Sequence, residues 1–194
     1  NWISLGGANY LSVGTHLKMY ISQGGAYYDI TPLRATTSAG DVTFSASSGS
    51  STITITDSSH EALVNDFVTF SGAATLGGVI TADVLNQNYQ ILTTPNANTY
   101  TISAKDTSGT SVSANGSDTS NGGGSTVGAY EIAVGANIAI PIVGWSAGTF
   151  GNGTWGNGTS SNLSLRLWSQ ATFGQDLVFA PRGGALYRWD AAAG

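Results

Sequence analysis

The feature that most constrains the fold is a run of short strand-like segments between residues 41 and 104. In STITITD (residues 51–57) isoleucine alternates with threonine, so Ile53 and Ile55 share one face and the threonines share the other. This alternation is typical of a half-buried antiparallel strand. Turn-forming clusters separate five further segments of the same kind, DVTFSAS, DFVTFSG, VITADVL, YQILTT and TYTISA. The pattern predicts a compact β-sandwich or barrel.

The two ends of the chain follow one plan. YLSVG, HLKMYIS and AYYDIT read as strands near the start, and the Gly24–Gly25 pair between the last two is a good two-residue hairpin turn. LSLRLWS, DLVFAP and ALYRWD read as strands near the end, and the Arg-Gly-Gly at residues 182–184 lies between two of them. We therefore interpret Arg-Gly-Gly as a hairpin turn rather than as a nucleic-acid tag, with Arg182 free to face a partner or DNA.

These segments predict an all-β chain with four parts. Residues 1–40 and 127–194 would form blade-like antiparallel sheets in a propeller-like arrangement that could be incomplete, the second part opening on a Gly/aromatic loop. Residues 41–104 would form the inserted β-sandwich or barrel module, with one helical turn in residues 57–66. Residues 105–126 have almost nothing to bury and predict a Gly/Ser-rich linker or loop.

The charge content excludes one class of function. Charged residues make up 9% of the chain, against a usual value of about 25%, and the net charge is −5. Six cations are too few for a protein that coats DNA by neutralising phosphates. An acidic wall repels phosphate, so the composition remains compatible with a surface past which DNA slides. The absence of cysteine excludes disulfides and thiolate metal sites, and no apolar run predicts a membrane anchor.

Several stretches resemble a known family: GAYEIAVG, GWSAGTFGNGTWGNG, LRLWSQATFGQDLVFAPRGGALYRWD and VGTHLKMYISQGGAYYDITPLR. They are similar to segments of virion structural proteins of short-tailed phages, in particular the tail nozzle proteins, also called tail tubular protein B. The block from ITITDSSHEALVNDFVTFSGA to NANTYTIS is similar to a small β-module that recurs in phage tail and fibre proteins. Nozzle proteins are several times longer, so these 194 residues would be a fragment or a reduced version.

The resemblance implies a structural role in the virion. A nozzle-like protein would form a homo-oligomeric ring, most simply sixfold, that contacts other tail proteins and surrounds the channel for DNA ejection. Strand edges and apolar patches left open by one chain would be buried against identical neighbours. The family offers no catalytic residues to transfer, so we expect no enzymatic activity and no catalytic, cofactor-binding or metal residues.

His60 and Glu61, with Asp57 three residues before His60, are candidates for a metal or acid/base site. Zinc requires three or four well-placed ligands, and the only other histidine, His16, is distant in sequence. Because aspartate is common at strand ends and in turns, we expect these residues to be structural.

The residue types leave two alternative functions open. A glycan-degrading enzyme needs two carboxylates about 5–9 Å apart, and no local pattern supports the candidates Glu131, Asp176 and Asp190.

A glycan-binding adhesin or tail-fibre module is the second alternative. Its candidates are aromatic residues that could stack on sugars near the Gly/Asn-rich loop, namely Tyr130, Trp145, Phe150 and Trp155. The same rings could instead pack in the core or at a subunit interface.

Overall fold

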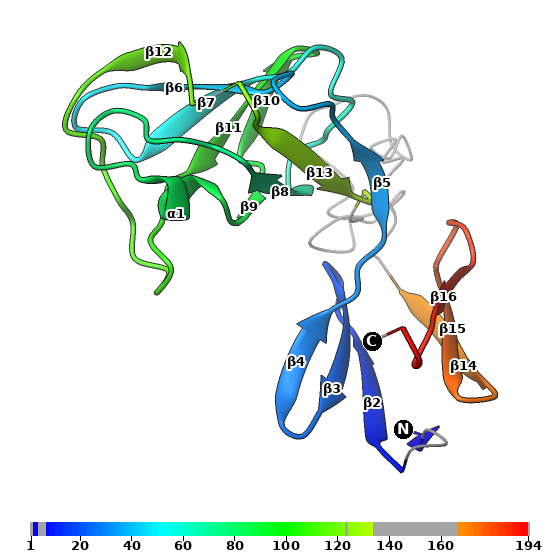
Figure 1. Ribbon diagram of the computed structural model, residues 1–194. Coiled ribbons are helices and arrows are strands. Elements are labelled where there is room, and N and C mark those ends of the chain that lie inside the picture. The colour runs from blue at the N-terminus through cyan, green and yellow to red at the C-terminus, as the bar shows by residue number, and fades with distance from the viewer. Residues whose placement is uncertain (1, 4–6, 123, 134–166, 194) are drawn as a thin grey trace, which may run out of the picture. The chain divides into compact units, whose positions relative to one another are not determined.

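The computed structural model describes residues 2–3, 7–122, 124–133 and 167–193, and it confirms an all-β fold (Figure 1). Every strand pair in these ranges is antiparallel, and none of the sheets closes into a barrel. The chain divides into two compact units. Unit 1 comprises Asn1–Thr31 and Val134–Gly194, and unit 2 comprises Pro32–Ala133. Unit 2 is therefore inserted into unit 1, with wider bounds than the predicted module of residues 41–104.

Unit 2 contains two open sheets. One has five strands in the order β10 (Thr93–Asn96), β11 (Thr99–Ser103), β7 (Thr52–Thr56), β6 (Thr43–Ala46) and β12 (Asp118–Asn121). The other has four, in the order β5 (Leu33–Thr36), β13 (Val127–Glu131), β8 (Phe67–Ser71) and β9 (Asn88–Gln90). Figure 1 shows β5, β13 and β8 side by side.

The two sheets of unit 2 share one core. Ile53 and Ile55 of β7 are fully buried, as their alternation with threonine predicts. Phe44 of β6 and Phe70 of β8 meet edge to face with ring centroids 5.1 Å apart, which joins the two sheets. Because both sheets supply alternate side chains to this core, unit 2 is a β-sandwich and not a barrel.

One predicted strand of this unit is a helix. VITADVL contains α1 (Ala82–Leu85). The Thr81 hydroxyl accepts a hydrogen bond from the Val84 N–H at 3.4 Å, an N-cap that the strand interpretation overlooked. The helical turn expected in residues 57–66 is also wrong, because that segment forms turns held by side-chain hydrogen bonds.

Residues 105–126 differ from the predicted linker, since they belong to unit 2. β12 pairs with β6 at the edge of the five-stranded sheet, and Ala114 is buried. The Ala114 N–H donates to the Ser50 carbonyl at 2.9 Å, and the Val112 N–H donates to the Ala104 carbonyl at 3.0 Å. Backbone hydrogen bonds thus fix a segment whose side chains are too small to indicate burial.

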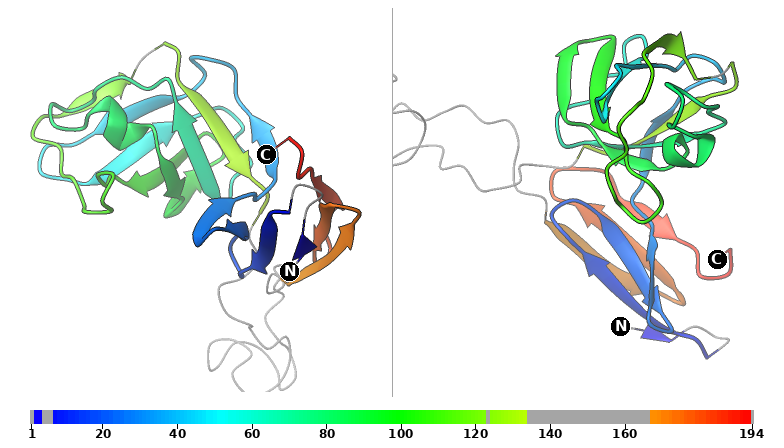
Figure 2. Two further views of the ribbon diagram at one scale, coloured as in Figure 1. Left: turned by 60° about the horizontal axis from the view of Figure 1, so that its bottom comes forward. Right: turned by 90° about the vertical axis from the view of Figure 1, so that its left-hand side faces the viewer.

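Unit 1 contains two sheets that reproduce the expected similarity of the two ends. The first has the order β1 (Trp2–Ile3), β2 (Asn9–Gly14), β3 (Met19–Gln23) and β4 (Ala26–Asp29). The second has the order β14 (Trp168–Phe173), β15 (Asp176–Pro181) and β16 (Tyr187–Trp189). In the right-hand view of Figure 2 the blue strands and the orange-to-red strands form two layers.

The core of unit 1 lies between these two sheets. Its fully buried side chains come from β3 and β15 and are Met19, Ile21, Leu177 and Phe179. At the rim, the Trp168 indole N–H donates to the Thr15 carbonyl at 2.6 Å. A Cβ at Gly14 would lie 2.6 Å from Trp168 Cδ1, so only glycine admits this close approach of the indole to the backbone.

Both predicted glycine turns are confirmed. Gly24 and Gly25 have φ values of 59° and 87° between β3 and β4. Gly183 has φ 73°, and the Gly184 N–H donates to the Pro181 carbonyl at 2.9 Å between β15 and β16. Arg-Gly-Gly is therefore a hairpin turn, with Arg182 exposed on it.

Candidate functional site

A buried polar cluster closes one end of the unit 2 sandwich. It is centred on the loop of residues 57–66 between β7 and β8, which we call the His60 loop. The Tyr130 hydroxyl of β13 donates a hydrogen bond to the Asp57 carboxylate, and the Tyr100 hydroxyl of β11 lies 2.8 Å from the Tyr130 hydroxyl. All three side chains are buried. The chain of hydroxyls therefore ties the loop to both sheets.

His60 is held in one neutral tautomer. Its Nδ1 accepts a hydrogen bond from the Ala62 N–H at 2.9 Å, which leaves the ring proton on Nε2, 3.1 Å from the Asn96 carbonyl. The ring meets Tyr100 edge to face at 5.0 Å. Arg34 of β5 donates to the His60 carbonyl at 2.8 Å. Both ring nitrogens are thus engaged within the unit.

The tyrosines of the cluster stay protonated at neutral pH. Burial raises the pKa of Tyr130, and the adjoining Tyr100 and Asp57 raise it further. Burial likewise raises the pKa of Tyr100. The Arg34 guanidinium carbon lies 5.0 Å from the centre of the Tyr130 ring, where it places positive charge near the buried carboxylate.

The backbone of the His60 loop is strained. Ser59, Glu61 and Asn65 have φ values of 58°, 51° and 76°, in the left-handed region that favours glycine. The Ser59 N–H donates to the Asn98 side chain at 3.0 Å, and the Asn65 N–H donates to the Ile91 carbonyl at 2.9 Å. The surrounding hydrogen bonds hold these conformations in place.

These contacts test whether Asp57, His60 and Glu61 form a metal or acid/base site. Asp57 and His60 do lie close together, but both are buried and engaged, whereas Glu61 is exposed. Within the described ranges, no three residues of His, Cys, Asp or Glu are grouped so that they could hold a metal ion. The buried contacts of Asp57 and His60 can therefore fix the conformation of the loop.

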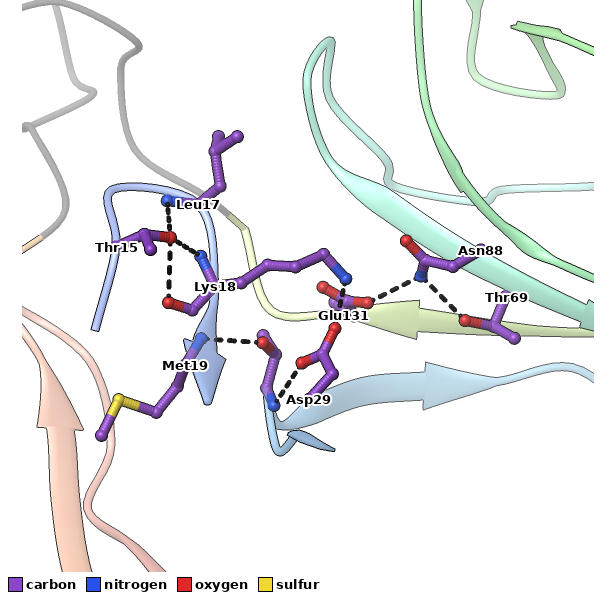
Figure 3. Close-up of polar contacts among 9 residues, drawn as sticks. Thr15, Leu17, Lys18, Met19, Asp29, Thr69, Asn88 and Glu131 are labelled. Atoms are coloured by element: carbon purple, nitrogen blue, oxygen red, sulfur yellow. Dashed lines mark hydrogen bonds and ion pairs between the residues drawn. The ribbon is translucent and has the colours of Figure 1, made fainter. Parts of the chain in front are cut away.

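Each carboxylate considered for glycan cleavage is engaged with a neighbouring side chain. Asp176 is buried, and its Oδ2 accepts from Arg188 Nε at 2.8 Å, while Asp190 lies 3.5 Å from the same guanidinium. These two belong to the hairpin of unit 1. Glu131 belongs to unit 2, where Asn88 Nδ2 donates both to Glu131 Oε1 and to Thr69 Oγ1, each at 2.8 Å (Figure 3).

Figure 3 also shows the polar contacts that shape the hairpin from β3 to β4 in unit 1. The Lys18 ammonium pairs with Asp29 Oδ2 at 2.5 Å, and Asp29 Oδ1 accepts from the Thr31 N–H at 2.9 Å. The Thr31 hydroxyl in turn accepts from the Met19 N–H at 3.0 Å. Asp29 therefore fixes the end of β4.

The aromatic candidates for sugar stacking are only partly tested. Tyr130 is 2% exposed, so of its two alternative roles the structure supports packing in the core and excludes stacking on a sugar. Trp145, Phe150 and Trp155 lie outside the described residues.

Among the described residues, the most exposed aromatic rings lie on β4 and β14 of unit 1: Tyr27 is 65% exposed, Tyr28 54% and Phe173 69%. The sequence could have indicated these rings, because two tyrosines follow the Gly24–Gly25 turn directly. We interpreted that stretch only as a strand.

Comparisons with known proteins establish no family. No family model matches the chain, and no curated protein matches it. Among solved structures, the endosialidase of phage phi92 aligns with 64% of this chain at 18% identity and a TM-score of 0.32. The chain spans 18% of that protein's length. Similarity at this level establishes neither a common fold nor a shared activity. No helix in the described ranges is long and apolar enough to cross a membrane.

Proposed function

We propose that this chain is a structural component of a phage virion, a nozzle-like tail protein that assembles with identical copies into a ring around the DNA-ejection channel. The role is mechanical and requires no catalytic residue. The support from the sequence is the set of segments near both ends and in the central block that resemble phage tail proteins. The support from the structure is the exposed apolar surface of unit 1.

This exposed surface is the observation that carries the proposal. In the described part of unit 1, residues 2–3, 7–31 and 167–193, the buried core cluster consists of four side chains. Six large apolar side chains of the same unit are strongly exposed, including Phe173 at 69% and Leu186 at 72%; the others are Leu11, Tyr27, Tyr28 and Leu167. We take these side chains as the surface that neighbouring copies would bury, since large exposed apolar patches mark sites of association with other proteins. In an assembly, exposed apolar side chains are buried against neighbouring copies. In a solitary domain they remain in contact with water.

The outer face of the five-stranded sheet in unit 2 is compatible with passing DNA. Thr54 pairs across the strands with Thr101 and with Ser45, and Thr56 pairs in the same way with Thr99. This face therefore carries hydroxyls where a typical sandwich carries lysine and glutamate. With a net charge of −5, such a surface offers few cations to hold phosphate.

Electron microscopy of the purified chain tests the proposal. A ring of identical copies around an open channel, most simply sixfold, is the expected result. A chain that stays monomeric at all concentrations would contradict the proposed function, and so would a ring whose lumen is strongly basic.

A glycan-binding role is the second candidate because Tyr27 and Tyr28 are both exposed on β4, one on each face of the strand. Aromatic faces of this kind can stack on sugars. A glycan array discriminates between the two functions. Specific binding that is lost in Tyr27→Ala and Tyr28→Ala supports the adhesin, and an array without binding supports the structural role.

A further inference from the structure

The end strands of the two sheets in unit 1 are β1 and β4 in one and β14 and β16 in the other, and β4 and β14 are the longer end strand of each. The order of the sheets leaves β4 and β14 with a partner on one side only among the described strands. Every residue of β4 is exposed, and every residue of β14 after Trp168 is exposed. In the described part of the chain, no other strand pairs with the outer edge of β4 or with that of β14 after Trp168, and the faces of both are accessible.

β14 lacks the features that normally protect an edge strand. Its six residues, Trp168–Phe173, include no charged residue and no proline. Its pairing with β15 runs through six successive residue pairs without a bulge. Natural edge strands are usually blocked by lysine, proline, a bulge or short length. A regular, uncharged and exposed edge of this length is a template for a further strand.

The hydrogen-bond pattern shows which backbone groups of β14 face outward. The Arg182 N–H donates to the Leu167 carbonyl at 2.7 Å, so Leu167 points its backbone groups toward β15. Because these groups alternate in direction along an antiparallel strand, the even-numbered residues point the other way. The outward N–H and C=O groups therefore belong to Trp168, Gln170 and Thr172.

The same reasoning applies to β4. The Ile30 N–H donates to the Met19 carbonyl at 2.9 Å, so Ile30 and the residues two and four positions before it face β3. Tyr27 and Asp29 consequently direct their N–H and C=O groups outward. The Asp29 carboxylate is already paired with Lys18, and β14 has no charge to oppose it.

We propose that the outer edge of β4 in one copy of this chain pairs with the outer edge of β14 in the next copy. This inference rests on the proposed ring and specifies its interface. Head-to-tail pairing of two different edges generates a ring when the rotation closes. It also leaves neither edge open, whereas a two-fold pairing of β14 with β14 would leave β4 uncovered.

Proline substitution tests this interface without breaking the hairpins. Gln170→Pro removes an N–H that points away from β15, and proline is tolerated on an edge strand in that orientation. The β14 to β15 ladder is retained, and only the outer edge is blocked. Tyr27→Pro does the same for β4. The matched controls Gln170→Ala and Tyr27→Thr keep the backbone N–H.

The full chain and these four variants are compared by native mass spectrometry and light scattering. The proposal predicts assembled wild type, assembled Gln170→Ala and Tyr27→Thr, and a loss of at least about tenfold in association for both proline variants. Unchanged tryptophan fluorescence shows that unit 1 stays folded in each variant. Because all five tryptophans lie outside residues 32–133, this signal does not come from unit 2.

Other results would overturn the inference. If Gln170→Pro is monomeric and Tyr27→Pro remains a dimer, β14 pairs with β14. If Tyr27→Thr is as defective as Tyr27→Pro, the side chain matters rather than the edge. If wild type and both proline variants assemble equally, the ring stands but uses another surface. A monomeric wild type instead contradicts the proposed function itself.

Discussion

At the scale of single residues, Tyr130 connects the parts of the polar cluster. Its hydroxyl donates to the buried Asp57 carboxylate and also contacts the Tyr100 hydroxyl at 2.8 Å. Its ring receives the Arg34 guanidinium at 5.0 Å. The sequence left two roles open for this ring, stacking on sugars near a Gly/Asn-rich loop or packing in the core. Periodicity identifies the strand, but it does not show whether an aromatic side chain on that strand has a buried polar partner.

Tyr130→Phe should destabilise unit 2. The substitution keeps the ring but leaves the Asp57 carboxylate without this donor and Tyr100 without its hydroxyl partner. Unsatisfied buried polar groups cost about 1–3 kcal/mol, so we expect a loss of that size in the free energy of unfolding. Urea denaturation followed by circular dichroism measures it. Tyr27→Phe is the control, since its hydroxyl is on an exposed side chain; equal effects for both variants would contradict the assignment.

The raised tyrosine pKa values predict a loss of stability in alkali. Burial raises the pKa of Tyr130, Tyr100 and Tyr89 in the folded chain. Above about pH 10 the unfolded chain loses these protons while the folded chain keeps them. The folded state then binds more protons, so its stability is fully present below that pH and falls as the pH rises. Each tyrosine contributes up to about 1.4 kcal/mol per pH unit.

Urea titrations between about pH 9 and about pH 11 measure this slope. Tyr130→Phe should lower the slope by about one proton, and Tyr27→Phe should preserve it. A flat profile in wild type would contradict the buried, protonated state of the cluster.

At the scale of elements, side-chain pattern predicted the strands that bury large residues. DVTFSAS, STITITD, DFVTFSG and TYTISA correspond to β6, β7, β8 and β11. The glycine turns of both terminal hairpins were predictable for the same reason, because a positive φ selects glycine. The side-chain pattern gave a wrong prediction where backbone hydrogen bonds or a helix N-cap determine the structure. The apparent strand VITADVL contains α1, whose N-cap is the Thr81 hydroxyl.

The segment of residues 105–126 is the largest difference between the predicted and the observed structure. It is fixed by backbone hydrogen bonds and by close approaches that need glycine, neither of which alters hydropathy. Gly122 has φ 110°, and a Cβ there would lie 2.2 Å from Cδ2 of the buried Phe44. No composition rule for linkers distinguishes this glycine from one in a flexible chain.

Gly122→Ala should therefore destabilise unit 2, because the new methyl group must displace Phe44 from the core. Such overpacking costs about 1–3 kcal/mol in addition to the strain of the backbone. Gly109→Ala is the matched control, since Gly109 has φ 89° but nothing within 4 Å of the added Cβ. Urea denaturation compares the two, and their difference isolates the contact with Phe44. Equal losses would indicate that the segment does not pack against the sandwich.

At the scale of the whole molecule, unit 2 is a single insertion between the two segments of unit 1. Its first and last strands, β5 and β13, pair antiparallel, with Leu33 opposite Glu131. The Ile132 N–H donates to the Pro32 carbonyl at 2.9 Å. The two crossings between the units therefore lie next to each other, a geometry that permits insertion of one domain into another without distorting either.

Residues 32–133 should consequently fold when produced alone. The piece retains both sheets, their shared core and the polar cluster, and its two ends are already joined by the β5 to β13 ladder. We expect its free energy of unfolding to lie within about 1 kcal/mol of the corresponding transition in the full chain, because the piece keeps its own sheets and core and additivity holds for independent parts. Circular dichroism in urea measures both. Tyr130→Phe should cost the excised piece as much as it costs the full chain, and a piece that is unfolded in buffer would show that unit 2 depends on the rest of the chain.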